Sequence, residues 1–291
     1  MVFPFLISQY IIANPLNANS PHAFDSLTCM ATEMLTLHYQ DTIITVLPEP
    51  QHVKSVFEAL LASPLPPAPT EQSRLFIDCS TIDPVTSRSV ASMVHNHSHP
   101  SGSQSSHADN VFVDAPMSGG VVGARAGGLT FMVGAGKEIM PRVEPILLLM
   151  GKKVWHMGPQ GAGLSGKLAN NYALAINNIA AAEAMNLGIK WGLEPKALAT
   201  LINSATGKSW PSEINNPVPG VIETAPAGRD YEGGFGVSLM KKDLKLAITA
   251  AKEANAKLAL AETARGVYEE TEKAYKGKDF SVVYRWLGGK E

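Results

Sequence analysis

A lysine and two asparagines share one face of a helix predicted in the second half of the chain. Lys167, Asn171, Leu174 and Asn178 fall within a narrow arc at 3.6 residues per turn. The rest of this segment, up to Gly188, is mostly Ala, Leu and Ile, which is typical of a buried helix. Burial would lower the pKa of the lysine toward neutrality and suit it to proton transfer. An exposed polar face or a hydrogen-bond network in the core would give the same pattern.

A serine and two glycines follow a predicted strand in the segment DAPMSGGVVGA, residues 114–124. Ser118, Gly119 and Gly120 can present a hydroxyl and unobstructed backbone N–H groups, a concavity suited to a carboxylate. Glycine pairs also form purely structural turns. A third polar segment, MKKDL at 240–244, carries adjacent lysines that would by default lie on a solvated helix face.

The segment GAGLSG, residues 161–166, matches the dinucleotide-binding fingerprint, follows a strand and opens a helix. A genuine fingerprint needs a second strand with an acidic end about twenty residues later, whereas here the helix continues. Together with Lys167 the segment also resembles a phosphate-binding loop, but in that motif the lysine is followed by Ser or Thr, whereas here it is followed by Leu168. We therefore interpret these glycines as a hinge between two domains or as a place where a ligand approaches the helix.

Four histidines lie in the Ser-rich segment 95–107: His95, His97, His99 and His107. They could chelate a metal, but their Ser/Gly/Pro surroundings supply no fixed geometry, so we expect a surface insertion and no metal site.

Strand and helix patterns divide the chain into two parts. Short β-rich runs alternate with helical stretches, which favours an α/β fold with a largely parallel βαβ sheet. Helical patterns then dominate to the end of the chain. We predict a sheet domain over 1–160 and a helical domain over 161–291. The predicted strands are 41–47, 74–78, 111–115, 129–134 and 152–157, and the predicted helices are 161–191, 195–206, 237–255, 257–275 and 280–287.

Composition narrows the function classes. A formal net charge of -2 and 45% hydrophobic residues indicate a soluble globular protein with no tail that requires nucleic acid or an anionic membrane. Two cysteines, Cys29 and Cys79, exclude a disulfide framework and indicate a reducing compartment. The first 40 residues carry no Lys or Arg, so we find no readable targeting signal there, and their apolar run is too short to span a bilayer.

Four long segments, taken together and in order, resemble the β-hydroxyacid dehydrogenase family over about four fifths of the chain. They are DAPMSGGVVGARAGGLTFMVGAG, GAGLSGKLANNYALAINNIAAAEAMNLGIKWGLEP, NPVPGV and GGFGVSLMKKDLKLA. The resemblance implies a Rossmann-type domain, a helical domain and a long interdomain helix that carries the catalytic lysine, here Lys167.

The resemblance also implies roles for other positions. Ser118, Gly119 and Gly120 match the segment that receives the substrate carboxylate, and Asn171 matches an amide that helps to hold the substrate. The positions that match cofactor contacts are Leu47, Pro48, Thr81 and Lys242.

The chain departs from the family pattern at its start. The family begins with a strand followed by GLGxMGxxMAxNL, whereas the first glycine here is Gly102. The pyrophosphate of a dinucleotide would lose a close backbone approach and a helix N-terminus. We therefore expect the first βαβ unit to be missing or altered and NAD to bind weakly or not at all.

For an active chain the resemblance implies oxidation of 3-hydroxyisobutyrate to methylmalonate semialdehyde with NAD, a step of valine catabolism, in a homo-oligomer joined through the helical domain. It also implies the mitochondrial matrix, although the sequence alone leaves the cytoplasm open. Three alternatives remain: a reductase of another short semialdehyde, a catalytically silent family member, and, less favoured, a 6-phosphogluconate dehydrogenase, whose helical domain is normally much longer.

Overall fold

The computed structural model describes residues 42–62, 73–97 and 110–290, with the side chains of 121 and 122 left out. The described chain divides into two compact units, one formed by residues up to Ser118 together with Gly127–Ser165, the other by Gly119–Ala126 and the residues from Gly166 onward. Our expectation of a missing or altered first βαβ unit falls on residues 1–41 and therefore lies outside the described residues.

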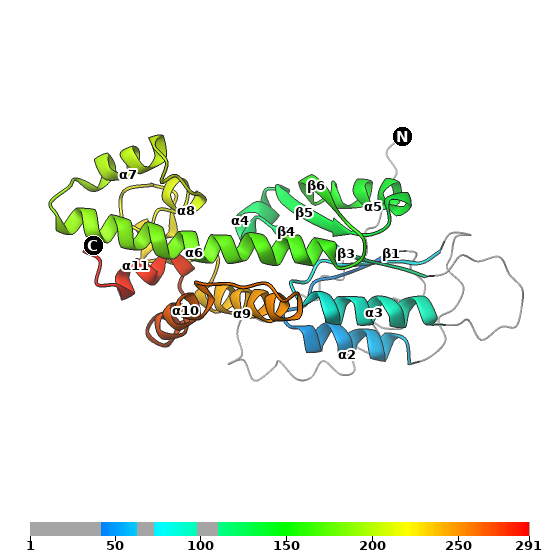
Figure 1. Cartoon of the computed structure of the whole chain (residues 1–291). Helices are drawn as coiled ribbons and strands as arrows, with labels where there is room; N and C mark the ends of the chain where they lie inside the picture. The colour runs from blue at the N-terminus through cyan, green and yellow to red at the C-terminus, as the bar shows by residue number, and fades with distance from the viewer. Residues whose placement is uncertain (1–41, 63–72, 98–109, 291) are drawn as a thin grey trace, which may run out of the picture. The chain divides into compact units, whose positions relative to one another are not determined.

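The first unit is built on a six-stranded sheet (Figure 1). Strands β1 to β3 pair in parallel, β5 pairs antiparallel with β3 and β4, and β6 runs parallel to β5. The strands are β1 (Thr42–Thr45), β2 (Leu75–Asp78), β3 (Val111–Asp114), β4 (Met117–Ser118), β5 (Leu129–Gly134) and β6 (Gly151–Gly158).

Helices cover the two faces of this sheet (Figure 1). Phe76 packs with residues of α2 (Pro50–Leu60) and α3 (Pro84–Asn96). Its strand neighbours Leu75 and Ile77 pack instead with the short helix α5 (Met140–Leu147), which follows a 3₁₀ turn, η1 (Lys137–Ile139). Successive strand residues point to opposite faces, so a strand that is buried on both faces needs a continuous apolar run. Residues 75–77 of β2, with the sequence LFI, form such a run.

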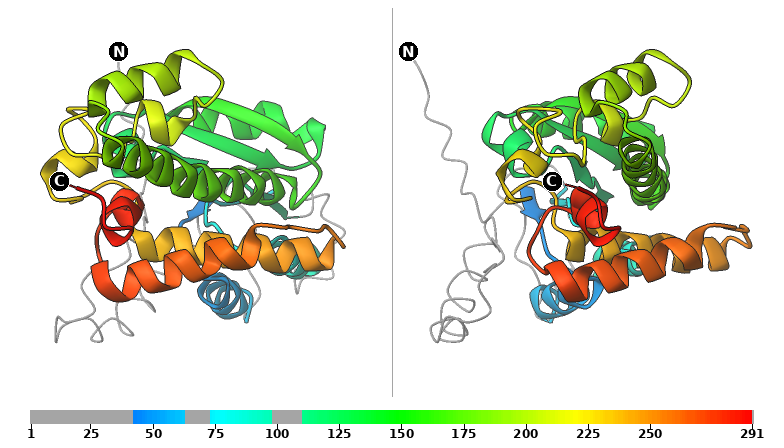
Figure 2. Two further views of the ribbon diagram at one scale, coloured as in Figure 1. Left: turned by 60° about the vertical axis from the view of Figure 1, so that its left-hand side comes forward. Right: turned by 90° about the vertical axis from the view of Figure 1, so that its left-hand side faces the viewer.

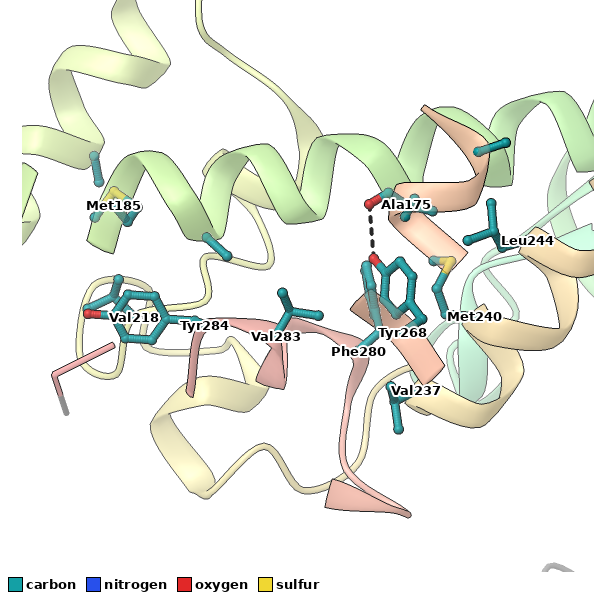
Figure 3. Packing of buried hydrophobic residues seen from close by; sticks show 14 of the residues in the cluster. Ala175, Met185, Val218, Val237, Met240, Leu244, Tyr268, Phe280, Val283 and Tyr284 are labelled. Carbon is teal, nitrogen blue, oxygen red and sulfur yellow. Dashed lines mark hydrogen bonds between the residues drawn. The ribbon is translucent and has the colours of Figure 1, made fainter. Parts of the chain in front are cut away.

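The second unit is helical. Its longest element, α6 (Ala162–Lys190), starts in the first unit and continues through the second; α9 and α10 lie side by side (Figure 2). One apolar core joins these three helices to the C-terminal segment, and Figure 3 shows Tyr268, Phe280 and Met240 within it. The other elements are α4 (Gly120–Arg125), α7 (Pro195–Ser204), α8 (Trp210–Glu213), η2 (Pro226–Arg229), α9 (Val237–Glu253), α10 (Ala261–Tyr275), η3 (Phe280–Val282) and α11 (Val283–Trp286).

The predicted fold class is confirmed: a mixed, mainly parallel α/β unit is followed by a helical one. Within the described ranges the five predicted strands are present, and their bounds differ from the predicted ones by at most two residues. The patterns missed β4, which has two residues, and the short helices α4 and α8, because such elements are too short to show periodicity. No helix in the described residues is long and apolar enough to cross a membrane.

Candidate active site

Lys167 lies in the second turn of α6 and is only 7% exposed. Burial is the main cause that lowers its pKa; the nearby ammonium of Lys242 lowers it further, and the carboxylate of Asp243 opposes both. A lysine whose pKa is depressed has an accessible neutral amine, which can take up a proton and return it.

Asp243, on α9, contacts two of the predicted site residues of the second unit. Its Oδ2 accepts a hydrogen bond from Nδ2 of Asn171 at 2.6 Å, and its Oδ1 lies 3.3 Å from the ammonium of Lys242. The carboxylate is 2% exposed. A buried carboxylate is tolerated only where polar or charged groups compensate it, and here those groups are the predicted site residues.

The two asparagines in the polar stripe of α6 have different hydrogen-bond partners. Asn171 turns to Asp243, whereas Asn178, seven residues later, donates to the Tyr268 hydroxyl at 3.0 Å and to the Phe280 carbonyl at 3.1 Å. The Tyr268 hydroxyl in turn donates to the Ala175 carbonyl at 2.9 Å (Figure 3). Asn178 therefore belongs to a core hydrogen-bond network, as one interpretation of the stripe predicted, whereas the substrate-holding role of Asn171 stays a prediction.

The two adjacent lysines of α9 also have different surroundings. The side chain of Lys241 is 37% exposed and pairs with Glu272, whereas that of Lys242 is 15% exposed and lies against Asp243. The expectation of a solvated face fits Lys241 and does not fit Lys242.

In the first unit, a buried carboxylate ties together the loops after β1 and β2. Oδ1 of Asp78 accepts hydrogen bonds from the hydroxyls of Thr45 at 2.8 Å and Ser80 at 2.6 Å. The Ser80 hydroxyl accepts the backbone N–H of Leu47 at 2.8 Å. Leu47 and Thr81, two of the predicted cofactor contacts, are thus held at the carboxyl ends of neighbouring parallel strands, where ligands bind in open α/β sheets.

The residue beside Ser80 is Cys79, a buried free thiol. Burial is the main cause that raises its pKa, and the negative charge of Asp78 adds to the effect. Thiolate is the reactive form, so this cysteine is inert while the unit is folded.

A second buried carboxylate, Asp114 at the end of β3, caps the start of α6. It accepts the backbone N–H groups of Gly161 at 2.6 Å and Leu164 at 2.9 Å. Burial raises its pKa to about 6, although these two hydrogen bonds act in the opposite direction. Two of the N–H groups that a phosphate could use in the GAGLSG segment are therefore already occupied.

Gly163 has a packing role in the same turn. A Cβ at this position would lie 2.2 Å from the Met132 carbonyl oxygen and 2.8 Å from Oδ2 of Asp114. The glycine match is explained by close contact between helix and strand within the first unit.

Ser118, Gly119 and Gly120 lie where the chain passes from the first unit to the second. Gly119 and Gly120 have φ values of 136° and 57°, which L-residues with side chains rarely adopt. This backbone leads directly into α4, whose first turn is closed by a hydrogen bond from Gly123 N–H to the Gly119 carbonyl at 2.9 Å.

The structure thus groups the predicted positions within each unit. Lys167, Asn171 and Lys242 come together in the second, and Leu47, Pro48 and Thr81 lie in two joined loops of the first. Among the described residues no three His, Cys, Asp or Glu side chains gather as metal ligands; His99 and His107 lie outside these residues.

Sequence reasoning assigned no role to Asp243. It stands beside Lys242 in the MKKDL segment, and a carboxylate on an otherwise apolar helix face was the signal that could have identified it.

Two family models match the chain. One, described as the NAD binding domain of 6-phosphogluconate dehydrogenase, matches residues 13–158. The other, described as NAD-binding of NADP-dependent 3-hydroxyisobutyrate dehydrogenase, matches residues 161–287.

Similar proteins agree with these matches. The chain is 44% identical over 252 residues to a probable mitochondrial 3-hydroxyisobutyrate dehydrogenase of Dictyostelium discoideum, covering 85% of this chain and 73% of the relative. It is 40% identical over 249 residues to the NAD-dependent L-serine dehydrogenase of Pseudomonas aeruginosa, covering 84% and 78%. A solved structure of Mycobacterium tuberculosis 3-hydroxyisobutyrate dehydrogenase with L-serine has 37% identity and a TM-score of 0.75, covering 85% and 79%.

Proposed function

Because the chain belongs to the 3-hydroxyisobutyrate dehydrogenase family, we propose that it oxidises 3-hydroxyisobutyrate to methylmalonate semialdehyde with NAD as cofactor. The observation that carries this proposal is the cluster of the buried residues Lys167, Asn171 and Asp243 with the partly buried Lys242 in the second unit. It combines an amine of lowered pKa with an amide and a carboxylate in fixed positions, as proton transfer to and from a small polar substrate requires.

Lys167 is the proton-transfer group in this proposal. Its neutral Nζ takes the proton of the substrate hydroxyl, and in the reverse direction the ammonium returns a proton to the aldehyde oxygen. The lowered pKa favours the neutral form needed for oxidation, and Asp243 limits how far the pKa falls, so that reprotonation remains accessible.

Asn171 and the serine–glycine turn hold the substrate in this proposal. Asp243 fixes the amide orientation of Asn171, which leaves one amide N–H for the substrate. Ser118, Gly119 and Gly120 receive the carboxylate through the serine hydroxyl and backbone N–H groups.

A bound nicotinamide would supply the hydride acceptor. The first unit fits such a group, because Leu47, Pro48 and Thr81 lie in loops at the carboxyl ends of parallel strands, and the Leu47 N–H bond to the Ser80 hydroxyl, itself held by Asp78, joins these loops. Lys242 adds a cation on the second unit. We propose these four residues as the cofactor contacts.

Gly120→Val tests the carboxylate site. The φ of 57° makes any side chain at 120 strained, and a β-branched one would also cover the N–H groups. Gly127 has a φ of 58° and nothing within 4 Å of its Cβ position, so Gly127→Val is a matched control for strain alone. We expect Gly120→Val to raise KM for the acid at least tenfold more than the control does; equal effects would reject the carboxylate role.

A catalytically impaired chain is the alternative that the sequence itself favours. Several charge-assisted hydrogen bonds to phosphate, each contributing about 1.5 to 3 kcal/mol, normally come from the glycine turn, and the first glycine here is Gly102. We predict that this 291-residue chain binds NAD weakly. Calorimetric titration with NAD tests this, and micromolar affinity with ordinary turnover would show the prediction to be wrong.

L-Serine is the second candidate substrate, because one relative is named an L-serine dehydrogenase and the similar solved structure contains L-serine. Both acids carry a primary alcohol beside a carboxylate-bearing carbon, and they differ in a methyl against an ammonium group. Turnover with 3-hydroxyisobutyrate, L-serine and short hydroxy acids, compared as kcat/KM, ranks the candidates; NADP in place of NAD completes the comparison.

Several relatives carry the word mitochondrial in their names. We propose the mitochondrial matrix and valine catabolism as the cellular setting, and self-association through the helical unit. Fractionation of cells that express the natural gene product tests the first of these proposals.

A further inference from the structure

A pocket lies between helices α9 and α10 of the second unit. The two helices follow one another along the chain and lie side by side, so they run antiparallel (Figure 2). The pocket has a volume of about 410 Å³, which is within the range of sites for small molecules. Its lining residues are Lys245, Ile248, Thr249 and Lys252 of α9 and Glu262 and Arg265 of α10.

The α9 side of this pocket is one face of the helix. Lys245, Thr249 and Lys252 are spaced by four and three residues, so their side chains project in the same direction. All three are exposed, whereas Ile248 is only 7% exposed and belongs to the apolar core of the unit. The α9 side therefore presents two ammonium groups with a hydroxyl between them, beside an apolar side chain.

The α10 side provides no acidic partner for these two lysines. Arg265 forms ion pairs with Glu262 and with Glu269, each at 2.7 Å, and so engages both carboxylates on this side of α10. Neither Lys245 nor Lys252 forms an ion pair with any residue that the structure describes. Their charges are therefore compensated only by solvent and its ions.

The pocket has an excess of positive charge in a chain whose formal net charge is -2. Three of its lining side chains are cations, and only Glu262 is an anion. A single exposed lysine is ordinarily a solvated group. Two lysines and an arginine around one concave site instead attract an anion, and their N–H groups can donate to it from several directions.

We propose that this pocket binds a small molecule that carries two or more phosphate or carboxylate groups. Lys245 and Lys252 are seven residues apart, or about 10 Å along the helix axis. A ligand with charged groups at both ends matches this separation better than an anion with one charged group. The Thr249 hydroxyl can donate to an oxygen between the two ends. This inference goes beyond the proposed dehydrogenase reaction, because no lining residue of the pocket is among the proposed site residues.

Calorimetric titration of the full chain tests the pocket. Pyrophosphate and citrate are the probes, because they present phosphate and carboxylate groups respectively, and acetate is the comparison with one charged group. Lys245→Ala and Lys252→Ala each remove one cation from the lining. Lys152→Ala is the matched control, since Lys152 is also exposed but lies on β6 in the first unit. Circular dichroism checks the folding of every variant.

We expect pyrophosphate or citrate to bind with a Kd below about 1 mM at low ionic strength, and acetate to bind about tenfold more weakly or not at all. The probe that binds more tightly identifies the preferred group. Lys245→Ala and Lys252→Ala should each weaken binding about tenfold, because each removes charge-assisted hydrogen bonds, and Lys152→Ala should leave the Kd unchanged. Glu262→Gln should tighten binding, since it removes the only carboxylate of the lining.

Two results would overturn this inference. The first is a folded wild type that binds neither pyrophosphate nor citrate. The second is binding that Lys245→Ala and Lys252→Ala weaken no more than Lys152→Ala does, because the anion would then lie elsewhere on the chain. The titrations contain neither NAD nor substrate, so the outcome does not depend on whether the chain is an active dehydrogenase.

Discussion

The buried carboxylates of the two units have different kinds of partners. Asp78 and Asp114, at the ends of β2 and β3, accept hydrogen bonds from backbone N–H groups and hydroxyls that hold loops and a helix start in place. Asp243, on α9, accepts from Asn171 and lies beside Lys242, and it acts on the pKa of Lys167. Asp78 and Asp114 hold backbone segments of the first unit in place, whereas Asp243 holds side chains that we propose to take part in the reaction.

Burial and a perturbed pKa therefore do not by themselves identify a reactive group. Asp114 has a pKa raised to about 6, yet its oxygens are occupied by the backbone. Asp243 differs in that its partners, Asn171 and Lys242, are side chains that we propose to contact the substrate or the cofactor.

Lys167→Ala should lower kcat/KM for 3-hydroxyisobutyrate by at least about 100-fold at saturating NAD, because a positioned acid–base group typically contributes that much. Lys241→Ala, at the exposed lysine that pairs with Glu272, serves as control and should stay within about twofold. Steady-state kinetics with thermal denaturation as a folding check decides the matter. If the Lys167→Ala enzyme were as active as the control, Lys167 would not be the proton-transfer group.

Asp114→Ala should lower the free energy of unfolding by about 3 kcal/mol, because it leaves two buried N–H groups without an acceptor at about 1 to 3 kcal/mol each. Asp83→Ala removes a partly buried cap from one N–H of α3 and should cost about 1 kcal/mol. Urea titrations measure both values. Equal losses would mean that Asp114 is no more than an ordinary helix cap.

Asp243→Asn should shift the rising limb of the kcat/KM profile for oxidation toward lower pH by about one unit. Asp243 raises the pKa of Lys167, so removing its charge lets that pKa fall and makes the neutral amine available at lower pH. Glu272→Gln is the control and should leave the limb in place. A shift toward higher pH would show that Asp243 does not act through Lys167.

The last prediction concerns the pH dependence of stability. The pKa of Asp114 is raised in the folded state to about 6 from 3.8, so the folded protein binds this proton more tightly than the unfolded chain does. Its contribution is fully present below pH 3.8 and is lost as the pH rises through about 6. Asp78 and Asp279 are shifted in the same direction. The wild type should therefore lose more stability between pH 4 and pH 6.5 than Asp114→Asn does, and parallel curves would refute this assignment.

How much the sequence could predict depended on the distance along the chain between interacting groups. The strand at Leu75–Asp78 and the helix at Ala162–Lys190 were predictable because their patterns are local and long enough to read. The resemblance brought Lys167, Asn171 and Lys242 into one set, and their proximity in the second unit agrees with it. Their roles stay predictions.

The contacts of Asp243 and Asp114 could not be predicted from local patterns. Asn171 and Asp243 are 72 residues apart, and Asp114 reaches Gly161 across 47 residues. The same long-range contacts explain why GAGLSG resembles a nucleotide-binding turn: a carboxylate takes the place that a phosphate has in such a turn, and both need small residues and free N–H groups nearby.

Cys79, between Asp78 and Ser80, can report on the opening of the first unit. Its thiol is buried and its pKa is raised, so an alkylating reagent can modify it only in molecules whose sheet has transiently opened. The labelling rate of the peptide that contains Cys79, followed by mass spectrometry, would therefore measure the opening equilibrium of that unit separately from the second. Added NAD should slow the labelling in proportion to the fraction of molecules that bind it. The labelling rate of Cys79 would therefore measure NAD binding without any measurement of turnover.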